Sequence, residues 1–275
     1  MSKRYGTELS VSEFAAIMGM SRQTLIYYDR IGLFPPARID PDTGYRYYDR
    51  RQIGRMSFIQ TLAGLGVPLA EIREEVSEIR PDRMEGLLRR QRASIRKEIE
   101  RLRRSEAMVS FRLEQLRQSR DEEPGTVRLI HEDKPAPLFV SGPLSCGKDP
   151  LPDRVIVDFY AEAERRGIPF GYPMGCIVSG EDIAAGRTDR VSRLLLPLGS
   201  DDGANACRQV GDYLVLRERT DCGGTPAAYA RLLDEAAVRG LRPAGDAVEE
   251  YELDEVTCAD PADFLCRIAL PVEKE

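Results

Sequence analysis

Four consecutive polar residues near the start of the chain could contact the edges of DNA base pairs. They are Ser21, Arg22, Gln23 and Thr24. An arginine can donate two hydrogen bonds to guanine, and a glutamine can pair in a similar way with adenine. Ser21 is a favourable helix N-cap, so the four residues would stand in the first turn of a helix. Many short helices begin with such residues, and this segment alone leaves a purely structural role open.

A tyrosine-rich segment at positions 45 to 48 follows the turn-forming stretch Asp40–Gly44. We expect two short strands around this turn. Tyrosine hydroxyls and a guanidinium on such a wing would suit the phosphates that position a protein on DNA. The predicted DNA-binding residues are Ser21, Arg22, Gln23, Thr24, Tyr27, Tyr45, Arg46, Tyr47 and Arg50.

Apolar spacing predicts the elements that would position these residues. The residues between Leu9 and Met18 space like one face of a short helix that Ser10 or Ser12 can cap. Gly19 supplies the turn to the second helix. Further helices are predicted at 50–64 and 68–79. Together these elements predict a winged helix-turn-helix.

The charge of the chain divides into a basic front and an acidic back. The whole chain has 275 residues, 42% of them apolar, and a net charge of -6. Residues 1–57 hold nine Lys and Arg against six Asp and Glu, whereas residues 121–275 hold 17 against 30. This asymmetry is typical of a DNA-binding end joined to a different module.

A long helix is predicted from residue 82 to about residue 120. The segment contains no proline and one glycine, and apolar residues recur at spacings of three and four. A helix that is polar on most sides needs a partner for its apolar seam. We therefore expect the domains to be 1–80 for DNA binding, 81–120 for dimerisation, a linker at 121–126, and 127–275.

The last of these domains reads as two similar halves. Strands are predicted at 127–131, 136–143, 172–179 and 190–198, and again at 204–209, 212–219, 246–254 and 263–271. Helices are predicted at 153–166 and 226–239. The helix-ending Arg-Gly pair at Arg166 recurs at Arg239, 73 residues later. Each half would be strand, strand, helix, strand, strand, and the joint between two such halves is a natural ligand cleft.

Residues 9 to 76 resemble the DNA-binding domain of the MerR family of transcriptional regulators. The resemblance rests on the run Tyr27–Leu33, on Gly44–Tyr48, and on Gly66–Ile72, in this order. The chain departs from the family pattern at Ile26, where arginine is usual, which puts one DNA contact in doubt. No metal-sensing cysteine stands at either end of the long helix.

The resemblance implies a homodimer joined by an antiparallel coiled coil of residues 82–118. Such a dimer binds double-stranded promoter DNA with an overlong spacer. When an effector binds, the dimer distorts the spacer so that RNA polymerase can use the promoter, and specificity comes partly from DNA deformability.

Residues 127–272 resemble the GyrI-like effector-binding domain of multidrug-responsive members. The segment Gly245–Tyr251 carries this resemblance, and it assigns the effector carboxylate to Glu249. Strand alternation places Glu249 and Tyr251 on one face, and Glu250 and Glu252 on the other. A carboxylate in an aromatic cleft would bind a lipophilic cation. If Glu249 were instead exposed, the aromatic residues would simply be core.

The other residues expected around the effector are aromatic. They are Tyr160, Phe170, Tyr172, Tyr213, Tyr229, Tyr251 and, with less support from the pattern, Phe264. Two alternatives stay open. Glu249 and Tyr251 could serve as base and proton donor in a small-molecule hydrolase, or the domain could sequester a drug.

Cysteine usage and hydropathy exclude several classes. The six cysteines all lie after residue 145 and no two are closer than eight residues, so neither a CxxC pair nor a compact metal site is expected. We expect no cofactor and no catalytic role. No apolar run approaches the roughly 20 residues of a membrane span, and we expect a cytoplasmic α+β protein with His131 exposed near the linker.

Overall fold

The computed structural model describes residues 8–77, 80–121, 124–220 and 224–274. The chain divides into two compact units, residues 1–98 and 99–275. Across the described residues, no helix is both long and apolar enough to cross a membrane.

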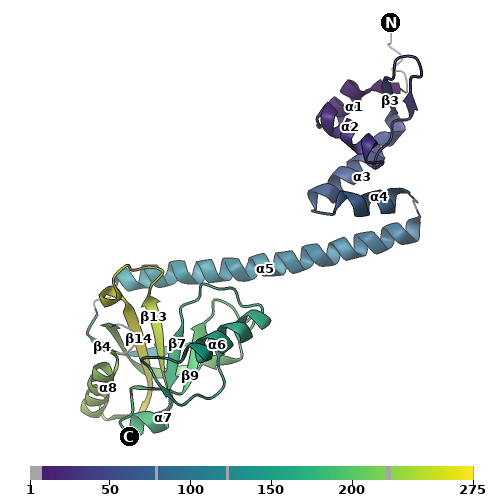
Figure 1. Cartoon of the computed structure of the whole chain (residues 1–275). Coiled ribbons are helices and arrows are strands. Elements are labelled where there is room, and N and C mark those ends of the chain that lie inside the picture. Colours follow the sequence, from purple (N-terminus) through teal and green to yellow (C-terminus); the bar gives the residue numbers. More distant parts are fainter. Residues whose placement is uncertain (1–7, 78–79, 122–123, 221–223, 275) are drawn as a thin grey trace. The chain divides into compact units, whose positions relative to one another are not determined.

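The N-terminal unit is a helix-turn-helix with a small sheet (Figure 1). Its elements are β1 (Glu8–Ser10), α1 (Val11–Ile17), α2 (Arg22–Arg30), β2 (Arg38–Ile39), β3 (Arg46–Asp49), a 3-10 turn (Arg50–Gln52), α3 (Ile53–Gly64) and α4 (Leu69–Ser77). The strands pair in the order β1-β3-β2. Of the two cap candidates for α1, Ser10 is the one used, in a capping box with Glu13. Gly19 takes a left-handed backbone (φ 61°) in the turn, a conformation that glycine adopts without steric cost.

Three aromatic rings form the centre of this unit. Tyr48 is fully buried and stacks on Phe14 and Phe34, with ring centroids 4.9 and 5.8 Å away. Burial raises the pKa of Tyr48 to about 12. Of the tyrosines in the segment 45–48, Tyr48 therefore joins the wing to the core, and its buried hydroxyl does not face DNA.

Helix α5 (Pro81–Asp121) is the predicted long helix. Near its start, Met84 and Leu87 pack into the core of the N-terminal unit. Near its end, Met108 and Phe111 pack into the C-terminal unit. Six other apolar residues remain 38 to 62% exposed: Leu88, Ile95, Ile99, Leu102, Val109 and Leu113.

The C-terminal unit is built on an antiparallel, curled sheet of nine strands. Its main strands are β4 (Val127–Glu132), β5 (Ala136–Val140), β7 (Gly175–Val178), β9 (Arg193–Pro197), β10 (Ala206–Arg208), β11 (Gly211–Arg219), β13 (Ala247–Leu253) and β14 (Leu265–Lys274). They lie in the order β10-β5-β9-β7-β13-β14-β11-β4, and β12 (Leu241–Pro243) pairs with β14. The strands β4, β5, β7 and β9 of the first half correspond to β10, β11, β13 and β14 of the second half. If corresponding strands are exchanged, the order is unchanged when it is read from the opposite end of the sheet. The two halves therefore have equivalent places in the sheet.

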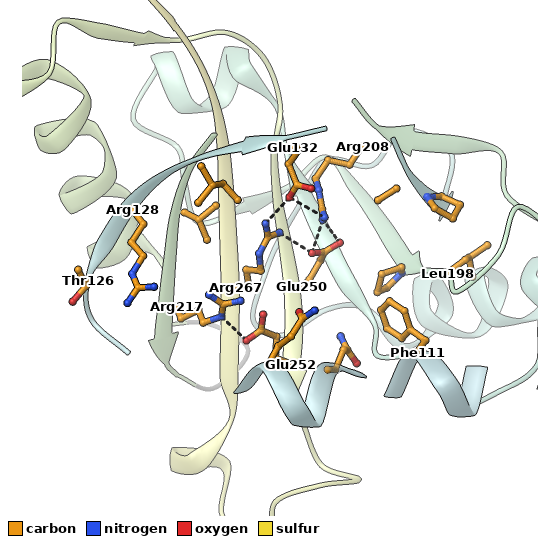
Figure 2. Close-up of a pocket in the computed structure, with 17 residues that line it drawn as sticks. Phe111, Thr126, Arg128, Glu132, Leu198, Arg208, Arg217, Glu250, Glu252 and Arg267 are labelled. Atoms are coloured by element: carbon orange, nitrogen blue, oxygen red, sulfur yellow. Dashed lines mark hydrogen bonds and ion pairs between the residues drawn. The ribbon is translucent and has the colours of Figure 1, made fainter. Parts of the chain in front are cut away.

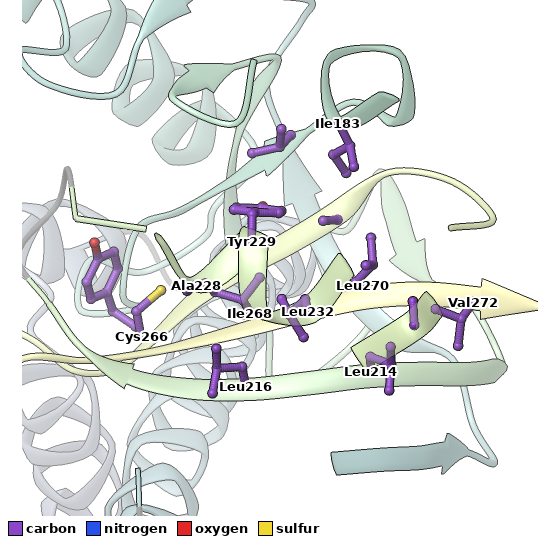
Figure 3. Packing of buried hydrophobic residues seen from close by; sticks show 14 of the residues in the cluster. Ile183, Leu214, Leu216, Ala228, Tyr229, Leu232, Cys266, Ile268, Leu270 and Val272 are labelled. Carbon is purple, nitrogen blue, oxygen red and sulfur yellow. The ribbon is translucent and has the colours of Figure 1, made fainter. Parts of the chain in front are cut away.

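Helices α6 (Asp153–Arg165) and α8 (Pro226–Val238) cover the same face of this sheet. Under α8, apolar residues of β11, β13 and β14 surround Tyr229 and Leu232 (Figure 3). Under α6, Phe159 stacks on Phe139 of β5 with centroids 5.2 Å apart. Cys176 packs under α6 and Val178 under α8, and alternation along β7 places these two side chains on one face.

Two short elements lie outside the predicted pattern. One is a two-residue strand, β6 (Cys146–Gly147), which pairs with β8 (Arg190–Val191) away from the main sheet; β8 is the first part of the strand predicted at 190–198. A five-residue helix, α7 (Gly180–Ala184), is capped by Ser179. Elements this short leave little periodicity in a sequence.

The only histidine of the chain gives a test of the pairing between β4 and β11. His131 is exposed, and its Nδ1 lies 2.6 Å from Asp212 Oδ1 on the neighbouring strand. The hydrogen bond to Asp212 raises the pKa of His131 above its usual 6.5. We expect its NMR titration to show this, and Asp212→Asn to lower the value. Because the folded-state pKa is raised, the stabilising effect is full at low pH and is lost as the pH rises through that pKa. A titration of His131 unchanged by Asp212→Asn would contradict the pairing.

Candidate functional site

The first turn of α2 presents the polar residues expected to contact DNA. Ser21 is the N-cap: its hydroxyl accepts a hydrogen bond from the Thr24 backbone N–H at 3.0 Å and lies 2.7 Å from the Thr24 hydroxyl. These two side chains therefore fix the start of the helix. Arg22 and Gln23 are exposed beside them, and Tyr27 is 49% exposed one turn later.

The wing is attached to α2 by an ion pair. Arg46 Nε lies 2.7 Å from Asp29 Oδ2, so Arg46 links β3 to the second helix. Tyr47 is half-buried under the guanidinium of Arg38, 4.4 Å from the ring centroid. Tyr45, at 68% exposure, is the residue of the wing most open to a DNA backbone, and Arg50 is exposed in the turn that follows.

Glu249 lies on β13, on the face that the helices cover, and is 2% exposed. Its carboxylate forms an ion pair with Lys148 and accepts hydrogen bonds from Thr225 Oγ1 (3.3 Å) and Cys176 Sγ (3.4 Å). Burial and inward orientation agree with strand alternation. The open cleft expected around Glu249 is not present, because Lys148 of the same chain already occupies the place of a cation.

Lys148 is the residue that sequence reasoning missed. It follows β6, is 5% exposed, and donates to the Thr188 carbonyl and to Thr225 Oγ1, both at 2.6 Å, as well as to Glu249. Its ammonium nitrogen lies 4.9 Å from the centre of the Tyr229 ring. Burial, and then the negative charge of Glu249, raise the pKa of Tyr229 well above its usual value. Tyr229 is therefore neutral and offers its ring face to the ammonium.

The structure brings together only some of the aromatic residues assigned to the effector site. Tyr229, Tyr251 and Phe264 belong to the apolar cluster under α8. Tyr172, packed on Phe111, belongs to the cluster under α6 together with Tyr160.

Two further assignments need correction. Tyr213 packs with Val215 and Ala269 on the opposite face of the sheet, and its hydroxyl donates to the Gln209 carbonyl. It cannot line a site around Glu249, because alternation along β11 turns it away. Phe170 is 63% exposed and packs only at the edge of the α6 cluster, 5.9 Å from the Tyr160 ring.

The opposite face of β13 is also buried, which strand alternation alone did not indicate. Glu250 pairs with Arg208 (2.6 Å) and Arg267 (3.1 Å), and both arginines also pair with Glu132. Arg208 and Glu132 stand on β10 and β4, the two ends of the strand order, so the sheet curls until its ends meet through charges.

These ion pairs form the wall of a cavity of about 550 Å³ (Figure 2). Glu252, which pairs with Arg217 at 2.7 Å, also lines it. Phe111, Gln115 and Gln118 of α5 contribute the side opposite the sheet. The cavity therefore lies on the face away from Glu249, and a ligand there would touch α5.

Within the described ranges, no cluster of His, Cys, Asp and Glu is arranged to hold a metal ion. Five cysteines are free thiols there, and Cys222 lies outside the described residues. Cys266 is fully buried, which raises the pKa of its thiol well above the usual value. A buried, protonated thiol is a poor nucleophile.

Comparison with known proteins finds a family profile for the N-terminal part and a relative over the full length. Residues 9–79 match the profile described as MerR HTH family regulatory protein. The multidrug-efflux transporter 2 regulator of Bacillus subtilis is 26% identical over 280 residues, covering all of both chains. The transcriptional regulator BrlR of Pseudomonas aeruginosa is 40% identical over 94 residues, 33% of this chain and 35% of that protein.

One solved structure resembles the chain over nearly its whole length. It is the cryo-EM structure of the EcmrR-DNA complex, with 19% identity, a TM-score of 0.43, and coverage of 97% of this chain and 100% of that one. The profile match and the full-length relative agree: residues 9–79 are a helix-turn-helix domain of the MerR type, and the chain is similar over its whole length to a regulator of multidrug efflux.

Proposed function

We propose that the chain binds promoter DNA as a homodimer and activates transcription by distorting the promoter spacer when a small molecule binds its C-terminal unit. The full-length relationship to a regulator of a multidrug-efflux transporter supports this function. The profile match supports DNA binding as the output. RNA polymerase at the same promoter would be the partner that uses the distorted DNA.

The first turn of α2 supports DNA binding, because two of its polar residues fix the helix end and the other two are exposed. Ser21 and Thr24 bind each other and the helix end, while Arg22 and Gln23 have no hydrogen-bond partner among the described residues. Side chains held near a helix start without an internal partner are suited to base edges and phosphates. Tyr27, Tyr45 and Arg50 would add contacts to the DNA backbone.

The homodimer is supported by the apolar stripe on α5. Its six exposed residues follow a seven-residue repeat, with Leu88, Ile95, Leu102 and Val109 in one position, and Ile99 and Leu113 in the other. Such a stripe is the seam of a coiled coil. We infer an antiparallel pairing of two copies of α5. We also infer that the C-terminal domain is GyrI-like and derives from a duplicated β-β-α-β-β unit.

The sensor part rests on Glu249. A buried carboxylate beside a neutral tyrosine ring is a site for a cation, and the structure already holds an ammonium there. We propose that the effector is a lipophilic cation bound at Glu249 with Tyr229 and Tyr251. Thermal-shift titration with 4-phenylbutylammonium, a lipophilic cation that carries N–H groups, tests this: the wild type should be stabilised, and Glu249→Gln should not. Equal shifts in both proteins would place the ligand elsewhere.

For DNA, we expect Arg22→Ala to weaken binding to the regulator's own promoter fragment by roughly 10- to 100-fold, since a bidentate arginine–guanine contact contributes about 1–3 kcal/mol. Fluorescence anisotropy at fixed moderate salt measures this. Arg154→Ala, which removes an exposed arginine of α6, is the matched control and should bind like the wild type. If both variants bind equally well, Arg22 is not a base contact.

A further inference from the structure

Lys148 makes all the contacts that a bound ammonium ligand would make at this site. Its three N–H donors reach three oxygens, on Glu249, Thr225 and Thr188, and its charge faces the ring of Tyr229. An ammonium has three donors and no acceptor, so its hydrogen-bonding capacity is fully used. With an exposed fraction of 5%, Lys148 fills the site rather than guarding its entrance.

We infer that Lys148 is a built-in occupant of the effector site, and that the effector of this chain is a protonated amine that takes its place. The inference rests on the proposed function, because it needs a sensor that binds at Glu249. It adds the chemical class of the ligand and the event that binding triggers, which is the release of Lys148.

The preference for a protonated amine follows from the two neutral acceptors. Thr188 O and Thr225 Oγ1 are both buried, and each accepts a hydrogen bond from Lys148. A quaternary ammonium or phosphonium would satisfy the charge of Glu249 but would leave these oxygens without a donor. Leaving buried acceptors unpaired is costly, so the site should select cations that carry N–H groups.

The segment that carries Lys148 is attached in a way that permits exchange. Lys148 follows β6, whose two residues pair only with β8, outside the nine-stranded sheet. Its backbone N–H bonds to the Asp189 carbonyl, which belongs to the same ribbon. Displacing this ribbon would break no strand pairing of the nine-stranded sheet, and its main packing contact is Val191 of β8 in the cluster under α6. Glu249 would have a cation before and after the exchange, so the large cost of an unpaired buried charge would be avoided.

Release of Lys148 would also remove a hydrogen bond at the start of α8. Thr225 is the residue before Pro226, the first residue of α8, and it binds both Lys148 and Glu249. The ammonium thus connects β13, the start of α8 and the ribbon of β6 and β8. Exchange of the cation would change all three at once.

The test compares three probes of one shape on the full-length protein: 4-phenylbutylammonium, its N,N,N-trimethyl counterpart, and uncharged 4-phenylbutanol. We expect Lys148→Ala to bind 4-phenylbutylammonium at least about tenfold more tightly than the wild type, because an internal competitor has been removed. The trimethyl probe should bind at least about tenfold more weakly than the amine, and the alcohol should not bind. Lys148→Arg, which keeps a cation in place, should not gain affinity.

The outcomes separate this inference from the proposed function. If the amine binds the wild type and Lys148→Ala equally, Lys148 is not a competitor and the inference alone fails. If the trimethyl probe binds as well as the amine, the selection for N–H donors is wrong. If neither protein binds either cation, the cation sensor itself is overturned. The gain should disappear in the double variant K148A/E249Q.

A measurement on the wild type covers the case in which Lys148→Ala does not fold. Hydrogen–deuterium exchange followed by peptide mass spectrometry reports how protected the backbone N–H groups of each segment are. The N–H of Lys148, which bonds to the Asp189 carbonyl, should be protected in the free protein and should exchange faster when 4-phenylbutylammonium is bound. Protection that stays unchanged at saturating amine would overturn the inference.

Discussion

Replacing Glu249 with leucine is expected to lower the free energy of unfolding by about 3–5 kcal/mol, the usual cost of removing one partner of a buried ion pair. The carboxylate is 2% exposed and Lys148 is 5% exposed, so the remaining ammonium would be left in an apolar interior. Thr225 and the Thr188 carbonyl would still accept hydrogen bonds from it, but neither carries a charge. Urea unfolding followed by circular dichroism measures the loss, since the chain has no tryptophan.

The double variant K148M/E249L is the decisive control. Replacing both members of a buried pair with apolar residues of similar size is often neutral or even stabilising. We therefore expect the double variant to be more stable than Glu249→Leu alone, although it contains one more substitution. Glu181→Leu on α7, an exposed position, controls for the exchange itself. A double variant that is less stable than the single one would show that Lys148 does not depend on Glu249.

Local sequence signals were sufficient to predict most of the elements. Apolar periodicity predicted α6 and α8 to within a residue or two, because each buries one stripe against a sheet. The order of the strands could not be read in this way. The sheet places β13 between β7 and β14, and this neighbourhood depends on packing across the whole unit.

At the proposed effector site, local sequence signals predict the direction of one side chain but not its partner. Alternation along β13 correctly turned Glu249 inward, since side-chain direction is a local property of a strand. Its partner Lys148 lies 101 residues away in the sequence, on a segment with almost no periodicity. The burial of Glu250 could not be predicted for a related reason: its partners Arg208 and Arg267 come from other strands.

Alternation on β13 therefore separates two different environments. Glu249 faces a compact site that holds one cation, whereas Glu250 and Glu252 face a cavity crossed by ion pairs. Glu249 and Glu250 are neighbours in the chain but offer a ligand different surroundings. The cavity is lined by four guanidinium groups, those of Arg128, Arg208, Arg217 and Arg267, and by only three carboxylates, those of Glu132, Glu250 and Glu252. This excess of positive charge favours Glu249, rather than Glu250, as the proposed cation site.

The stripe on α5 makes a second strong prediction, about how two copies pair. One position of the seven-residue repeat is occupied in turn by Arg92, Ile99, Glu106 and Leu113. Arg92 and Glu106, the two polar residues at this position, are both exposed. In an antiparallel pair centred between Ile99 and Leu102, Leu88 lies across from Leu113. In the same pairing, Arg92 lies one layer away from Glu106 of the partner subunit. A parallel pair would instead set arginine against arginine and glutamate against glutamate.

Glu106→Arg should therefore raise the dissociation constant of the dimer by about 10- to 100-fold, because like charges then meet twice in each dimer and a repulsion of about 0.7–1.4 kcal/mol at each exposed contact adds up to this change. Sedimentation equilibrium measures the dimer, and promoter binding should weaken in parallel. The exchanged variant R92E/E106R should recover most of the loss, since it restores opposite charges across the antiparallel seam. Glu100→Arg, one position beyond the stripe, should have little effect. In a parallel dimer Glu106→Arg would only replace one like pair by another, so an unchanged dissociation constant would contradict the antiparallel arrangement.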